Sequence, residues 1–189
     1  MKQMDQVVLI GTFLGFCWLA MQAVHEFGHV LAAWITGAEV IKVALHPGII
    51  SRTDLGHNPH PLFVVWAGPV VGSVIPLGAF LVAKVCRSPG VYMFRFFAGF
   101  CLIANGVYIA FGPSDGAADT GVMMQHDSPR WLLVLFGLLT APLGLYLWHR
   151  QGPHFGLGEA KGKVDRRAAI VSASLFVALA GVELIINSR

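Results

Sequence analysis

Charged residues are scarce in this chain. They make up 12% of its 189 residues, whereas 56% are hydrophobic and the mean hydropathy is +0.67. Soluble domains carry about 25% charged residues, so this composition excludes an ordinary water-soluble domain. The formal net charge is only +3, and the basic residues fall between apolar segments. Such residues are typical of topology signals and not of a nucleic-acid surface. We therefore expect an integral membrane protein with no nucleic-acid partner.

Paired cysteines are also absent. Cys17, Cys86 and Cys101 are scattered and form no C-x-x-C motif, which argues against a thiolate zinc site and favours small apolar side chains in helices. The first apolar run continues from Val7 to Ile35, so we do not expect it to be a cleaved signal peptide. No internal repeat is visible, whereas many transporters are built from two similar halves.

Five apolar segments are long enough to cross a bilayer, which takes about 20 helical residues. We predict these spans at about residues 7–36, 62–85, 92–111, 131–148 and 167–186. Residues 40–45 are rich in β-branched side chains, which predicts a short strand or hairpin after the first span. The expected fold is an all-α polytopic membrane protein with about five transmembrane helices. We expect one membrane-embedded domain over residues 1–189, with a core at 7–125 and two additional spans in 131–189.

The first predicted span contains the sequence His25-Glu26-Phe27-Gly28-His29. Ionisable residues are costly in hydrocarbon, so they usually mark a functional site there. On a helix, positions i and i+4 lie on the same face, and two imidazoles at this spacing can bind one zinc ion. Glu26 lies beside that pair and could take a proton from a metal-bound water. The alternative is a pair of buried histidines that bond to carbonyl groups, with Glu26 as their counter-charge.

A catalytic zinc generally has a third protein ligand, which must come from elsewhere in the chain. The polar break after the third span offers Asp115 and Asp119. Asp115 lies between Pro113 and Gly116, where local unwinding could turn a carboxylate inward. Asp119 could instead be the ligand, or could hold a ligand in place. Both could also belong to a solvated loop, with one of them as a helix cap.

The remaining polar candidates are weaker. The other histidines lie in the loop after the motif or near predicted membrane edges, where solvation is normal; they are His46, His57, His60, His126, His149 and His154. Asn105 lies inside the third span and needs a hydrogen-bond partner. It could pair with helix backbone or hold a substrate strand, and we favour the first of these.

Three motifs together resemble the site-2 protease family, the intramembrane zinc metalloproteases. They are His25-Glu26-x-x-His29, Ala67-Gly68-Pro69 at the second span, and Pro113-Ser114-Asp115-Gly116 after the third. Their order also matches, and the resemblance covers about residues 7–125. It implies that His25, His29 and Asp115 bind zinc, that Glu26 is the general base, and that the substrate is a peptide bond within the membrane.

The predicted function is therefore a zinc-dependent intramembrane endopeptidase that cleaves a peptide bond in or near a transmembrane segment of a membrane protein. The alternative is a catalytically silent, metalloprotease-like membrane scaffold or regulator. We expect a multi-pass protein of a bacterial-type cell membrane. Its orientation stays open, because the basic residues at 150–167 place the site toward the outer face, whereas the family resemblance implies the cytosolic side.

Overall fold

Five helices in the structure, a computed structural model that describes residues 2–112 and 118–187, are long and apolar enough to cross a membrane. They are α1 (Lys2–Thr36), α2 (Pro61–Val85), α3 (Val91–Phe111), α5 (Arg130–Trp148) and α6 (Arg166–Asn187). The predicted fold class is confirmed, and most helix ends agree with prediction within a few residues. α1 begins earlier than its apolar run, because the polar residues before Val7 include good helix formers.

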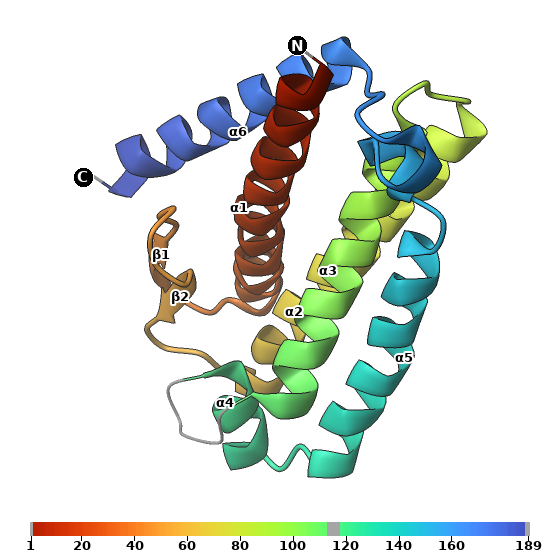
Figure 1. Cartoon of the computed structure of the whole chain (residues 1–189). Helices are drawn as coiled ribbons and strands as arrows, with labels where there is room; N and C mark the ends of the chain where they lie inside the picture. Colours follow the sequence, from red (N-terminus) through yellow and green to blue (C-terminus); the bar gives the residue numbers. More distant parts are fainter. Residues whose placement is uncertain (1, 113–117, 188–189) are drawn as a thin grey trace.

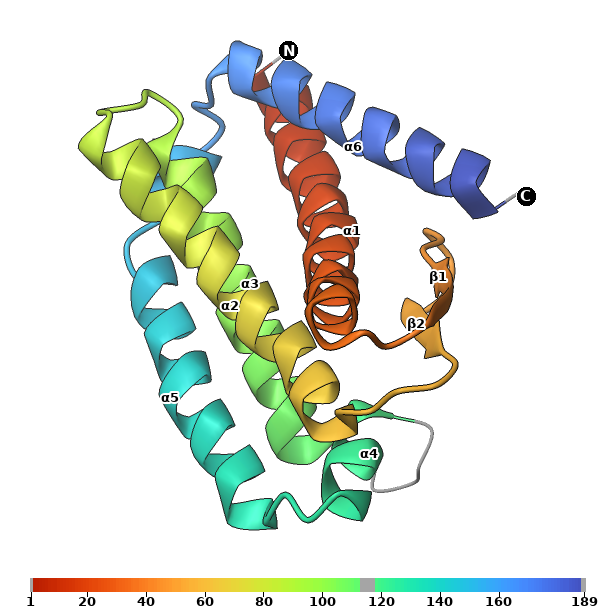
Figure 2. The same cartoon turned by 180° about the vertical axis from the view of Figure 1, so that it is seen from behind.

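The helices are arranged around α2 and α3 (Figures 1 and 2). α1 packs on α2, α2 packs on α3, and α3 packs on α5. α6 crosses the N-terminal half of α1 and points away from the other helices. A hydrogen bond of 2.8 Å joins the hydroxyl groups of Thr12 on α1 and Ser172 on α6 at this crossing.

Two short strands follow α1, as predicted. β1 (Val40–Ala44) pairs antiparallel with β2 (Arg52–Leu55), and the ladder contains an irregularity between Val40 and Lys42. The hairpin lies beside the C-terminal half of α1 (Figure 1), where the histidine motif is located.

The polar break after α3 contains a helix that the sequence did not predict. α4 (Asp119–Gln125) is seven residues long, which is too short for an apolar period to be read and too short to be stable alone. Its packing against α2 stabilises it. Two short 3₁₀ helices, η1 (Gly152–Phe155) and η2 (Gly158–Ala160), lie between α5 and α6.

Many large apolar side chains lie on the surface and several ionisable groups lie inside, which is uncommon in a soluble domain. Large apolar residues such as Val85 and Phe111 are more than four-fifths exposed, whereas His25, Glu26 and His29 are at least 93% buried. Exposed apolar surface on this scale favours contact with lipid, and buried ionisable groups among the helices are typical of functional residues. Together with the five candidate spans, this is consistent with a multi-pass membrane protein.

Candidate metal centre

The two histidines of the motif project from one face of α1, as their spacing predicts. The centroids of their rings are 4.9 Å apart, and both side chains are buried. α1 is unbroken through the motif and continues to Thr36. The helix therefore holds both imidazoles on one face, about 6 Å apart along its axis.

Asn105 on α3 determines which nitrogen of His25 carries the proton. The amide nitrogen of Asn105 donates a hydrogen bond to the carbonyl oxygen of Cys101, 2.9 Å away. Its amide oxygen therefore faces Nδ1 of His25, at 2.6 Å. Because that oxygen can only accept, Nδ1 must donate, and the lone pair of a neutral His25 is then on Nε2.

A backbone carbonyl does the same for His29. Nδ1 of His29 lies 2.9 Å from the carbonyl oxygen of Val64 on α2. A carbonyl oxygen only accepts, so Nδ1 is again the donor and Nε2 carries the lone pair. Hydrogen bonds of this kind orient metal-binding histidines in proteins.

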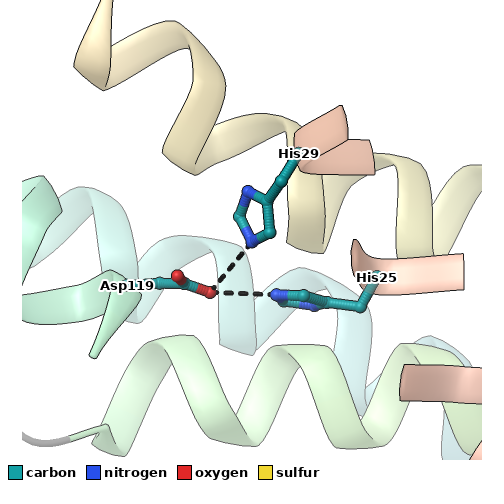
Figure 3. Close-up of side chains that lie close together, drawn as sticks. All are labelled: His25, His29 and Asp119. Atoms are coloured by element: carbon teal, nitrogen blue, oxygen red, sulfur yellow. Dashed lines mark hydrogen bonds and ion pairs between the residues drawn. The ribbon is translucent and has the colours of Figure 1, made fainter. Parts of the chain in front are cut away.

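Asp119, the first residue of α4, completes the group (Figure 3). Its Oδ2 lies 2.9 Å from Nε2 of His25 and 3.5 Å from Nε2 of His29. The backbone N–H of Asp119 donates to the hydroxyl of Tyr108, 3.3 Å away. Burial alone would raise the pKa of the Asp119 carboxyl, but hydrogen bonds and charge from the two imidazoles hold that pKa well below its usual value. Asp119 is therefore a carboxylate at neutral pH.

This geometry brings three potential ligand atoms together in a buried place. One atom each from His25, His29 and Asp119 lie within 4.8 Å of one another. Since both Nε2 atoms carry lone pairs when the rings are neutral, they and the carboxylate oxygen need either protons or a cation between them. Two ligands at about 2.1 Å from a tetrahedral zinc are about 3.4 Å apart. The observed distances from Oδ2 of Asp119 to the two Nε2 atoms, 2.9 and 3.5 Å, are close to this value. Two nitrogens and one carboxylate oxygen are a ligand set that zinc accepts, so the donor set fits this metal.

Glycine residues on α1 and α2 make room for the imidazoles. A Cβ atom at Gly68 would overlap the ring of His29 and would lie 2.9 Å from Nε2 of His25. A Cβ atom at Gly28 would overlap the backbone carbonyl of Ala67. The two helices therefore approach closely at this point because both positions lack a side chain. This gives the Ala67-Gly68-Pro69 motif a specific physical role beside the candidate metal centre.

Glu26 is held by the hairpin. The hydroxyl of Ser51 donates to Oε1 of Glu26 and the hydroxyl of Thr53 donates to Oε2, each over 2.7 Å. The backbone N–H of Ser51 also donates to Oε1 of Gln22, 2.7 Å away, one turn before Glu26. Glu26, His29 and Asp119 all line one cavity of about 140 Å³. The carboxylate is therefore beside the three ligand candidates and not among them.

In the described part of the chain, the other candidate residues from the sequence are not found in this group of ligand candidates. Asp115 lies outside the described residues, so its assignment as a ligand stays a prediction. Within residues 2–112 and 118–187, the group that could hold one ion contains none of the other histidines. His60 borders a separate surface hollow.

The structure confirms the favoured backbone contact of Asn105, adds a second contact for it, and adds residues that the sequence did not single out. Asn105 bonds to backbone, as we favoured, but it also orients His25. The carbonyl of Val64 and the hydroxyls of Ser51 and Thr53 carried no recognisable signal, because each reaches the motif only through packing.

The fold and the site together define a class: a polytopic helical protein with a candidate metal centre between one of its spans and a short helix. Comparisons of the chain with protein-family models, curated proteins and solved structures found no match.

Proposed function

We propose that this protein is a zinc-dependent endopeptidase that cleaves a peptide bond of a membrane protein within or near the bilayer. The observation that carries the proposal is the arrangement of the two Nε2 atoms. Both Nδ1 atoms are engaged as donors, and both Nε2 atoms face the carboxylate of Asp119. Three converging ligands favour a cation, and Glu26 follows His25 directly in the chain.

Each of these residues would have its own role in the proposed hydrolysis. His25, His29 and Asp119 would hold zinc, which when bound lowers the pKa of water and polarises a carbonyl group. Glu26 would accept a proton from the attacking water and pass it to the amine that leaves. The hydroxyls of Ser51 and Thr53 would orient the Glu26 carboxylate. The resemblance to site-2 proteases implies Asp115 as the third ligand in place of Asp119.

The location of the site supports a membrane-embedded substrate. The motif lies in the most N-terminal candidate span, and the residues around it expose apolar side chains such as Phe27 and Trp18. A substrate segment could therefore reach the site from lipid without crossing water. We place the protein in a bacterial-type cell membrane.

The test is a comparison of zinc content and cleavage in the purified protein. We expect about one zinc per chain in the wild type. Glu26→Gln should retain the zinc and lose cleavage of a mixture of transmembrane peptides, because only the base is removed. Glu39→Gln, an exposed carboxylate beside the hairpin, is the matched control and should retain both. A Glu26→Gln protein that cleaves as the wild type does would refute the proposal.

A second candidate function is supported by the same contacts at Glu26. Both of its carboxylate oxygens bond to the hairpin, as they would in a catalytically silent scaffold or regulator that uses Glu26 to fix β2 on α1. In that case Glu26→Gln would detach the hairpin and change its protease sensitivity, while no peptide would be cleaved by the wild type.

A further inference from the structure

A second and larger cavity also borders the candidate catalytic residues. It has a volume of about 400 Å³ and lies between α1 and α3, closed at one end by the segment before β2. Its apolar walls are Trp18, Met21, Ile50, Ile103, Ala104 and Val107. This volume falls within the range of about 300–1,000 Å³ that is usual for ligand pockets.

The cavity shares part of its wall with the proposed site. His25 and Glu26 are part of its wall, whereas Glu26, His29 and Asp119 line the smaller cavity. Glu26 and Ser51 belong to both walls, so the hydrogen bond between them lies where the two cavities meet. An extended chain that passes Glu26 would therefore have one side chain beside the larger cavity while its backbone faces the metal ligands.

Several polar atoms in the wall of the larger cavity already form hydrogen bonds. The side-chain oxygen of Gln22 accepts from the N–H of Ser51, and the amide of Asn105 bonds to His25 and to Cys101. Trp18 and Val107 are almost half exposed, so the rim opens on the apolar surface of the helices. The cavity therefore favours an apolar occupant that arrives from lipid, and it disfavours an anionic one, which would be buried beside the Glu26 carboxylate.

We infer that this cavity is a specificity pocket for a large apolar side chain, such as Leu, Met or Phe, beside the bond that is cleaved. The inference rests on the proposed function. A side chain in the pocket would determine which peptide bond of the substrate lies beside Glu26. Gly would be disfavoured at that position, because it has no side chain to bury in the pocket. Asp or Glu would be rejected because its charge would be buried beside the Glu26 carboxylate.

Cleavage products provide the first test. The full-length, zinc-loaded wild type is incubated with transmembrane peptides whose central positions vary among Gly, Ala, Leu, Phe and Glu. We expect Leu or Phe to be enriched at one fixed position relative to the cleaved bond. Ala104→Phe, which fills the pocket, should lower the cleavage of these peptides about tenfold or more and retain zinc. Ala141→Phe fills an apolar cavity between α3 and α5 and should change nothing.

Photocrosslinking provides a second test that needs no cleavage. A transmembrane peptide with a benzophenone side chain at the selected position, or at each central position in turn, is irradiated with the Glu26→Gln protein. Crosslinks to Met21 or Trp18, absent with Ala104→Phe, would support the pocket. Crosslinks elsewhere, or crosslinks at these residues only from a lipid that carries the same group on its acyl chain, would overturn it.

Cleavage and crosslinking together distinguish a failure of the proposed pocket from a failure of the proposed protease function. Crosslinks in the pocket without any cleavage by the wild type would support a pocket that binds apolar side chains of peptides, and would refute the protease. Cleavage with no residue preference, or with a preference that zinc-retaining Ala104→Phe does not alter, would refute the pocket and leave the protease standing.

Discussion

Replacement of Gly68 by alanine should weaken metal binding without removing any ligand. Gly68 lies on α2, and a Cβ atom there would overlap the ring of His29 and lie 2.9 Å from Nε2 of His25. Cβ atoms in real structures are not found that close to other heavy atoms. At least one imidazole must therefore rotate, or α1 must move away from α2.

The size of the effect follows from the cost of overpacking. An extra methyl group in a tightly packed interior costs about 1–3 kcal/mol. If the strain is relieved by moving the rings, that free energy is lost from metal binding, and about 1.4 kcal/mol corresponds to a factor of ten in affinity. We therefore expect zinc affinity to fall about 5- to 150-fold.

The assay is a competition for zinc between the purified protein and a chelator of known affinity. Gly78→Ala is the matched control, because it makes the same change on the same helix and its Cβ would meet nothing within 4 Å. That variant should bind zinc as the wild type does, and it should be slightly more stable, since alanine is the better helix former. Wild-type zinc affinity in Gly68→Ala would refute the assignment of the Nε2 atoms as ligands.

Four further predictions concern the same site. Asp119→Asn should lose zinc while Asp115→Asn retains it, as measured by zinc content; the reverse result would favour the ligand implied by the family resemblance. Asn105→Leu should lower zinc affinity about 10- to 100-fold in the chelator competition, because His25 loses the partner that fixes its tautomer, and unchanged affinity would contradict that role. Ser51→Ala should keep zinc but lower the turnover rate about fivefold, the effect of one lost hydrogen bond of about 1 kcal/mol, whereas an unchanged rate would show that this bond does not position the base. Zinc affinity should fall as the pH is lowered from 7 to 5, because protons compete with zinc for the imidazole nitrogens, while the lowered pKa of Asp119 keeps its carboxylate charged; equal affinities at pH 5 and pH 7 would exclude two histidine ligands.

The sequence by itself determined the spans and the pairing of His25 with His29. Both depend on local backbone geometry. An apolar run of about 20 residues is long enough for one helix to cross a bilayer, and a spacing of four residues places two side chains on one face of that helix. The hairpin after the first span was predictable for the same reason, because β-branched residues favour extended backbone where they occur.

Only the tertiary structure decided which groups surround those histidines. Asp119 is 94 residues from His25 in the chain, and Asn105 is 80 residues away. The carbonyl of Val64 has no side-chain signal at all, because any residue at that position would supply it. Asp115 and Asp119 are four residues apart in the chain, and the sequence left both as candidates for the third ligand.

The reason is that contacts between distant segments depend on how whole helices pack. The lack of side chains at Gly28 and Gly68 sets the close approach of α1 and α2, and α4 is too short to be read as a helix from its own residues. Local periodicity describes one element at a time, whereas a metal centre is built where several elements meet.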